Sequence, residues 1–199
     1  MAIEANIVMK LREETGAGMM DCKKALAETN GDFNAAKDLL RKKGEAKAAK
    51  RVGRATGQGR IGSYIHHNSK IGVLVEVRTE SDFVASNEVF LDFVKSVCMQ
   101  VAATAPRSLS KEDLDPKVVE HEKMIYAESE DVLSKPEKVR PKIIDGKMAA
   151  FYKSACLLEQ PLVTDESRTV ETLLKETISK FGENIRIVRF VRFELGETE

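Results

Sequence analysis

The chain has 199 residues and carries 32 Lys and Arg against 32 Asp and Glu, so its formal net charge is zero. This balance argues against a uniformly basic nucleic-acid binder, and a hydrophobic content of 42% argues against a disordered chain. Three scattered cysteines without a CxxC pair, and only three histidines, predict neither a disulfide scaffold nor a metal centre.

The N-terminus lacks the basic region and apolar run of a secretory signal. The most apolar stretch, residues 94–105, is broken by polar side chains and falls short of the eighteen or more apolar residues of a membrane span. These features predict a cytoplasmic protein that does not associate with a membrane.

Residues 5–44 predict a compact unit of three short helices. The glycine-containing segment 15–18 should separate the first two helices, because glycine tolerates the backbone angles of a sharp turn. Asp32 is predicted to cap the third helix, and Gly44 is predicted to end it.

Residues 41–60 hold eight basic residues and one acidic residue, Glu45. This stretch could bind nucleic acid or an acidic protein surface. We favour a solvated connecting helix followed by a linker, because a basic stretch without interleaved aromatic residues is weak evidence for binding. The chain is predicted to divide here into domains 1–55 and 56–199.

Two alternating runs follow and predict an antiparallel hairpin with its turn at Asn68 and Ser69. A third strand is predicted near the C-terminus, where Arg189 interrupts an otherwise apolar face and leaves that face partly open. The predicted apolar positions of the three strands are Ile61, Ile65, Val73, Val75, Val77, Ile185, Ile187, Val191 and Phe193.

Helical patterns fill the region between the hairpin and the last strand. Pairs of apolar residues recur every seven residues over 118–133, as in a short coiled-coil seam. Ser134 and Glu137 form a capping-box pattern for the next helix, which Pro141 should kink or interrupt. The clearest helical stripe comprises Val89, Phe90, Phe93, Val94, Val97 and Val101. A last helical stripe, predicted to end at Gly182, comprises Val170, Leu173, Leu174, Ile178 and Phe181.

These patterns predict an α+β fold, in which an N-terminal three-helix domain precedes a three-stranded antiparallel sheet packed with helices. No phosphate-binding loop, HExxH motif or GxSxG motif is present. Cys22 lies beside Lys23 and Lys24, but no general base is evident nearby. The sequence therefore argues against an enzyme and against a catalytic residue or cofactor.

Residues 79–87 connect the second predicted strand to the long apolar helix. Phe83 lies there among polar residues, beside Asp82. If Phe83 packs inward it is a core residue, and if it projects it is an apolar wedge for an interface. From the residues alone the inward orientation is slightly favoured, because most phenylalanines are buried.

The segment LREETGAGMMDCKKAL, at 11–26, resembles the N-terminal signature of translation elongation factor Ts. Later segments agree with this family in the same order: KAAKR at 47–51, SDFV at 81–84, CLLEQP at 156–161, and TV followed by LLKE within 169–176. The similarity spans most of the chain.

This resemblance implies a guanine-nucleotide exchange factor for elongation factor Tu, which it would meet in GDP-bound and nucleotide-free forms. It implies that the N-terminal domain resembles a ubiquitin-associated domain and docks on the GTPase through Arg12, Met19, Met20 and Lys23. It implies that Mg²⁺ is dislodged from the GTPase by a loop comprising Ser81, Asp82, Phe83 and Val84. The resemblance therefore favours Phe83 as a wedge.

Two features depart from the family pattern. Ser81 replaces the commoner threonine but keeps its hydroxyl group. The chain has strands for one core subdomain, where longer members have two, which suggests a homodimer.

Two other functions stay open: a non-catalytic protein-binding module and an RNA-associated factor that uses residues 41–60. The resemblance to elongation factor Ts implies no direct contact with nucleic acid.

Overall fold

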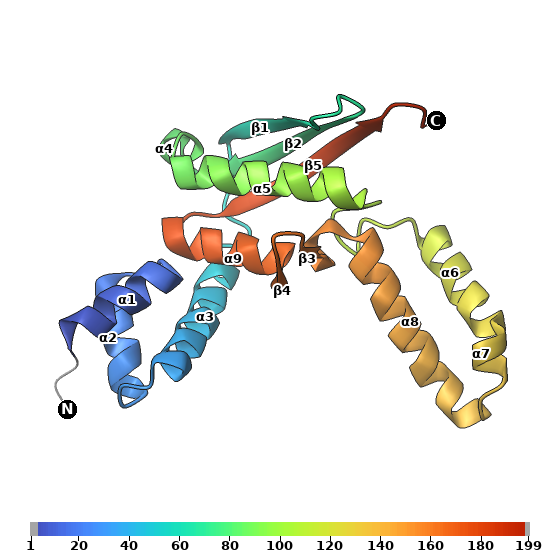
Figure 1. The fold of residues 1–199 in the computed structure, drawn as a ribbon, viewed down its shortest axis with the longest axis horizontal. Helices are drawn as coiled ribbons and strands as arrows, with labels where there is room; N and C mark the ends of the chain where they lie inside the picture. The colour runs from blue at the N-terminus through green and yellow to red at the C-terminus, as the bar shows by residue number, and fades with distance from the viewer. Residues whose placement is uncertain (1–3, 198–199) are drawn as a thin grey trace. The chain divides into compact units, whose positions relative to one another are not determined.

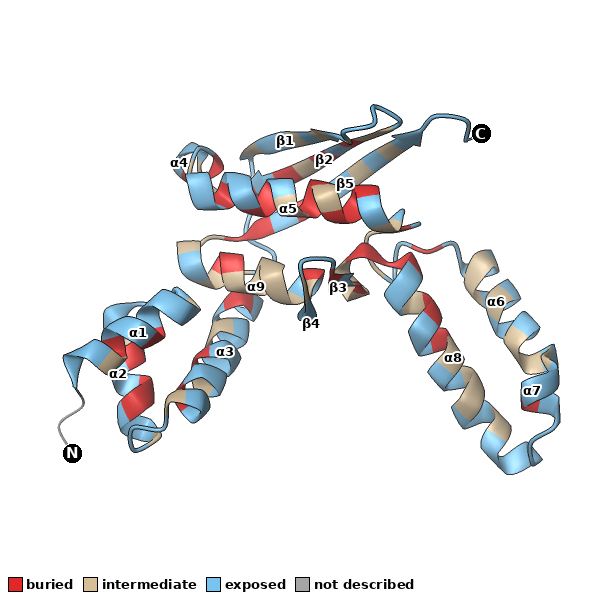
Figure 2. Ribbon diagram, in the orientation of Figure 1, coloured by how far each residue is buried: buried red, intermediate tan, exposed pale blue. Residues whose placement is uncertain are grey.

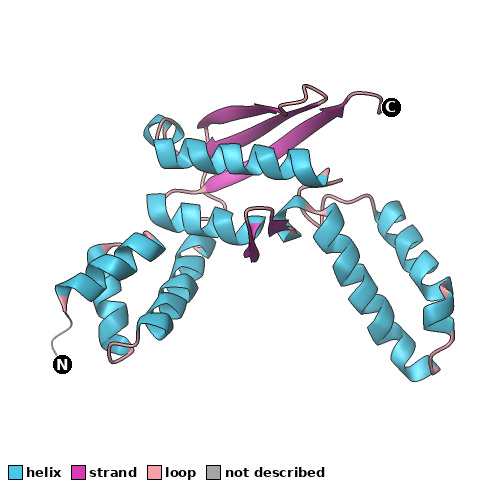
Figure 3. Ribbon diagram, viewed as in Figure 1, coloured by secondary structure: helices cyan, strands magenta, loops and turns pink. Residues whose placement is uncertain are grey.

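The computed structural model describes residues 4–197, and it has the predicted α+β fold (Figure 1). Helices make up most of the described secondary structure (Figure 3). The chain forms two compact units. The first contains the residues up to Arg60 together with Arg78–Phe93 and Thr172–Arg186, and the second contains Ile61–Val77, Val94–Glu171 and the residues from Ile187 onward.

Three helices open the first unit, as predicted: α1 (Ala5–Thr15), α2 (Met19–Glu28) and α3 (Phe33–Ala49). Gly16 ends α1 in the left-handed conformation, with φ of 65°, and its N–H donates to the Arg12 carbonyl. The Asp32 carboxylate caps α3 by accepting from the Ala35 N–H at 2.9 Å. The buried core of these helices comprises Val8, Leu11, Cys22, Ala25, Leu26, Ala36 and Leu40.

The prediction that Gly44 ends the third helix is wrong, because α3 continues to Ala49. The alanines after Gly44 favour continuation of the helix. The absence of a side chain at Gly44 allows α3 to lie close to Ser179, because a Cβ atom at this position would lie 3.2 Å from the Ser179 Oγ atom. Gly44 therefore marks a contact between helices, not a helix end.

A three-stranded antiparallel sheet has the order β1 (Gln58–Ile65), β2 (Ile71–Thr79) and β5 (Ile185–Glu194). The predicted hairpin between β1 and β2 is confirmed, with the His66 N–H donating to the Ile71 carbonyl and Ser69 at φ of 57°. On β2 the odd-numbered valines Val73, Val75 and Val77 are buried, whereas Leu74 is exposed. The sheet therefore has one covered face and one open face.

The long apolar helix is α5 (Glu88–Thr104), and it follows the short helix α4 (Asp82–Ala85). Its predicted stripe is buried (red in Figure 2) except for Val89, which is exposed near the start of the helix. A Cβ atom at Gly62 of β1 would lie 2.3 Å from Val94 Cγ1 and 3.0 Å from Cys98 Sγ. Helix α5 thus lies directly against β1 where that strand lacks a side chain.

The second unit contains a helical hairpin of α6 (Pro116–Glu128), α7 (Glu130–Leu133) and α8 (Arg140–Ala155), with a 3₁₀ turn at Glu137–Val139. Part of the predicted seam packs within this hairpin, where Val118, Val119 and Tyr126 lie against a buried cluster that includes Met148 and Phe151. For these three side chains, the repeat every seven residues reflects contacts within the chain.

Two predictions in this hairpin are wrong. Ser134 does not cap a following helix, because it ends α7 and its hydroxyl donates to the Asp131 carbonyl at 3.2 Å. Pro141 does not interrupt a helix, because it lies in the first turn of α8. Proline is tolerated in that turn, where its missing N–H has no acceptor within the helix.

A two-stranded ribbon of β3 (Pro161–Leu162) and β4 (Asp165–Thr169) follows the 3₁₀ turn Leu157–Glu159 and was not predicted. Helix α9 (Val170–Phe181) comes next and ends at Gly182, as predicted, with φ of 74°. Within residues 4–197 no helix has both the length and the apolar character that crossing a membrane requires.

Candidate functional site

The short helix α4 carries Asp82 and Phe83, and its two ends are fixed differently. At its start the Ser81 hydroxyl accepts from the Val84 N–H at 3.3 Å, as an N-cap does. At its end the Arg60 Nε donates to the Ala85 carbonyl at 3.0 Å. Val84 and Ala85 are buried, so they anchor α4 while its other two residues face outward.

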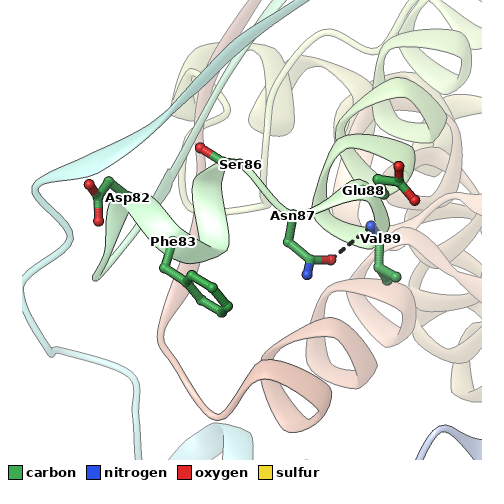
Figure 4. Close-up of a pocket in the computed structure, with 6 residues that line it drawn as sticks. All are labelled: Asp82, Phe83, Ser86, Asn87, Glu88 and Val89. Carbon is green, nitrogen blue, oxygen red and sulfur yellow. Dashed lines mark hydrogen bonds between the residues drawn. The ribbon is translucent and has the colours of Figure 1, made fainter.

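Phe83 is 77% exposed, which is the outward orientation implied by the family resemblance and not the inward one favoured from the residues alone. Figure 4 shows its ring extending away from α4, beside an open depression also lined by Asp82, Asn87 and Val89. An exposed aromatic ring of this kind is available to a partner, and its burial would contribute about 1.5 to 3 kcal/mol to an interface.

A carboxylate from a distant part of the chain holds the entrance to α4. Glu183 Oε2 accepts from the Thr79 Oγ1 at 2.9 Å and from the Ser81 N–H at 3.0 Å. Glu183 Oε1 accepts from the Ser81 hydroxyl at 2.6 Å. Partial burial raises the pKa of this carboxyl, but the hydrogen bonds from Ser81 and Thr79 outweigh burial and leave the pKa below its usual value.

A second carboxylate makes the reciprocal contact. Glu80 Oε1 accepts from the Asn184 N–H, and Glu80 Oε2 lies 3.6 Å from the Arg54 Nη1. The Asn184 side-chain amide in turn donates to the Arg54 carbonyl at 2.8 Å. Each of the two connections, one after β2 and one after α9, thus supplies a glutamate that binds the backbone of the other.

The four residues predicted for docking lie on α1 and α2. Met19, Met20 and Lys23 share one side of α2, since residues three and four apart are neighbours on a helix. All three are exposed, and Arg12 is exposed in the last turn of α1. Two exposed methionines beside cationic groups form an adaptable apolar surface suited to a protein partner.

Part of the basic stretch at 41–60 is paired with carboxylates of its own unit. Lys43 lies 2.8 Å from a Glu28 oxygen, Lys47 lies 2.7 Å from an Asp21 oxygen, and Arg54 pairs with Glu80. Neutralisation by neighbouring carboxylates lowers the positive potential that nucleic-acid binding requires. This arrangement weakens the case for an RNA-associated factor.

The three cysteines are free and buried. Burial raises the pKa of the Cys98 thiol to about 11. Burial is also the main cause of the raised pKa of the Cys156 thiol. Cys22 is buried in the core of the N-terminal helices and does not lie at a reactive surface.

Among residues 4–197 no cluster of three or more His, Cys, Asp and Glu side chains is placed to hold a metal ion.

Sequence reasoning did not find Glu80, Glu183 and Asn184. Ser81 and Glu183 lie 102 positions apart, so no local pattern links them. The only local signal was Gly182, which predicts a helix end immediately before Glu183 and therefore a polar connection there.

The family model described as "Elongation factor TS" matches residues 4–197. An "Elongation factor Ts" of Nitratidesulfovibrio vulgaris is 51% identical over 199 residues, covering the whole of both chains. An "Elongation factor Ts" of Geotalea daltonii is 54% identical over 197 residues, covering 99% of this chain and 91% of its own. That of Fervidobacterium nodosum is 50% identical over 197 residues, covering 99% of this chain and all of its own.

Proposed function

We propose that this chain, which belongs to the elongation factor Ts family of translation elongation factors, is a guanine-nucleotide exchange factor for elongation factor Tu. The proposal gives it no bond-making chemistry and no cofactor of its own. The observation that carries it is the exposed Phe83 ring on a turn that is fixed at both ends.

A GTPase holds its nucleotide through a phosphate cradle and a bridging Mg²⁺ ion. In the proposed mechanism Phe83 enters the GTPase and displaces the elements that support the metal site, while Asp82 competes for nearby hydrogen-bond donors. Loss of the metal leaves the phosphate charge less well neutralised, and GDP dissociates. Ser81 and Val84 act by holding the turn, because the Ser81 hydroxyl caps α4 and the Val84 side chain is buried.

Exchange also requires that the factor leave again. If the factor weakens nucleotide binding by some ratio, thermodynamic linkage requires that nucleotide weaken factor binding by the same ratio. Incoming nucleotide can therefore expel the factor. We assign the docking of the factor on the GTPase to Arg12, Met19, Met20 and Lys23, which lie apart in sequence from the intruding turn.

We further propose that the chain forms a homodimer through the open face of the sheet. In the second unit, Ile61 and Ile65 of β1 are 69% and 66% exposed, and Phe193 of β5 is 66% exposed. Leu74 and Val191 are also exposed, and the Arg189 Nε donates to Glu76 Oε2 at 2.7 Å. An apolar sheet face that contains an ion pair is suited to a self-complementary two-fold interface.

The test is release of labelled GDP from elongation factor Tu, measured with the unaltered protein and with Phe83→Ala in parallel. We expect the unaltered protein to accelerate release strongly and Phe83→Ala to lose about tenfold or more of the saturating rate. Complex formation with Phe83→Ala should persist, because the docking residues are unchanged. Val163→Ala is the matched control, since Val163 is an exposed apolar residue outside both proposed surfaces.

Each alternative has its own outcome. No acceleration by the folded, unaltered protein would reject the exchange function and favour a non-catalytic binding module. Acceleration that Phe83→Ala leaves intact would keep the exchange function and remove the role assigned to Phe83.

A further inference from the structure

The Glu183 carboxylate lies where α4 leaves the sheet, outside the residues assigned to partner contact. It accepts three hydrogen bonds from Thr79 and Ser81, the residues that flank Glu80 at the start of the turn. One of these donors is the same Ser81 hydroxyl that caps α4. Because the Ser81 hydroxyl donates its proton to Glu183, the lone pairs of the hydroxyl oxygen are free to accept from the Val84 N–H.

Resting on the proposed exchange function, we propose that Glu183 is the positioning residue of the intruding turn, and that its carboxylate orients Phe83 for GDP release without contacting the GTPase. The carboxylate fixes the direction of the Ser81 hydroxyl, the hydroxyl fixes the first N–H groups of α4, and α4 carries Phe83. Buried Val84 and Ala85 hold the other side of the same turn.

Geometry gives this carboxylate a role that an amide cannot reproduce. Three donors converge on two oxygen atoms, and a carboxylate can accept from all of them. In Glu183→Gln one oxygen becomes an NH₂ group. The amide can still accept from Thr79 and from the Ser81 N–H, but it faces the Ser81 hydroxyl with a donor. The hydroxyl must then reorient, and the cap on Val84 weakens.

Glu183→Gln should lower the rate of the exchange step more than it weakens docking on the GTPase. An intruding side chain contributes only if it is held in the orientation that the transition requires. A looser turn leaves Phe83 exposed and able to reach the partner, but fewer encounters place the ring correctly. The docking residues on α1 and α2 are unchanged, so the factor concentration that gives half of the maximal rate should change little.

The experiment measures GDP release from elongation factor Tu over a range of factor concentrations, for the unaltered protein, Glu183→Gln and Glu159→Gln. Glu159→Gln is the matched control, because it removes a partly buried carboxylate elsewhere in the chain, whose Oε1 lies 3.0 Å from the Lys111 Nζ. Hydrogen exchange of the Ser81 and Val84 amides, followed by NMR in the free protein, reports the order of the turn without any partner.

We expect Glu183→Gln to lower the saturating release rate about tenfold, which corresponds to the loss of one hydrogen bond to a charged group. The half-saturating concentration should stay within about twofold, and the Ser81 and Val84 amides should exchange faster. Glu159→Gln should change none of these quantities. Glu183→Asp, which keeps the charge on a shorter side chain, should retain part of the amide protection and part of the rate that Glu183→Gln loses.

Two results would overturn the proposal, and they differ from failure of the exchange function itself. A saturating rate unchanged in Glu183→Gln would show that the turn needs no positioning by this carboxylate. A raised half-saturating concentration with an unchanged saturating rate would show that Glu183 acts on docking or on the amount of folded protein, and not on the exchange step. If the unaltered protein gave no exchange, the proposed function would fail first and the positioning role with it.

Discussion

Glu183 shows how one side chain can link the stability of this fold to pH. Its pKa is raised by partial burial but lowered more strongly by hydrogen bonds from Ser81 and Thr79, so the folded state favours the charged form. A folded-state pKa below the unfolded value of about 4.3 stabilises the fold above that pH. This stabilisation is lost as the pH falls through the folded-state pKa.

We therefore expect Glu183→Gln to lower the free energy of unfolding by about 1 to 3 kcal/mol near pH 7. The difference from the unaltered protein should narrow as the pH falls from about 5 toward the folded-state pKa, because protonated Glu183 resembles the amide. Urea unfolding followed by circular dichroism at several pH values measures both curves. A difference that stays constant down to pH 3 would contradict the assigned hydrogen bonds.

At the scale of elements, two glycines determine how closely helices and strands approach. Gly44 lets α3 pass near Ser179, and Gly62 lets β1 lie against α5. The two sites differ in tolerance. At Gly44 the nearest atom is a serine hydroxyl oxygen at 3.2 Å, which can rotate. At Gly62 the nearest atom is Val94 Cγ1 at 2.3 Å, and Val94 is buried in the core.

Gly62→Ala should therefore destabilise the protein by about 1 to 3 kcal/mol, because an added methyl group must displace Val94 and Cys98. Thermal or urea unfolding measures this loss, and Val94→Ala in the same chain should recover part of it. Gly57→Ala is the control, since nothing lies within 4 Å of its added Cβ atom. Equal stability of the two single variants would refute the close packing of α5 on β1.

At the scale of the whole molecule, the open sheet face gives the proposed homodimer a specific test. Phe193→Lys places a charge at an exposed apolar position on β5 and should shift the protein from dimer to monomer. Sedimentation velocity at several concentrations measures the change, and the melting temperature should stay close to that of the unaltered protein. Leu133→Lys is the control, because Leu133 is similarly exposed but lies on α7.

An unaltered protein that sediments as a monomer at all concentrations would reject the homodimer. A dimer that persists in Phe193→Lys would place the interface elsewhere. Neither result would affect the exchange function, because Phe83 and the docking residues lie in the first unit and not on this face.

The sequence by itself determined the features that local rules control. The three N-terminal helices, the β1–β2 hairpin, the stripe of α5 and the stop at Gly182 follow from periodicity, capping and glycine conformation within a few residues. The family signatures at 11–26 and 81–84 also needed no coordinates to identify.

Only the tertiary structure decided the features that depend on distant partners. Gly44 is a contact and not a stop because Ser179 lies against it, and Phe83 is exposed because its neighbours Val84 and Ala85 occupy the core. Glu183 binds Ser81 across 102 positions, a pairing that no local spacing encodes. Local backbone preferences are properties of neighbouring residues, whereas the placement of the candidate site depends on which distant groups the fold brings within hydrogen-bond distance.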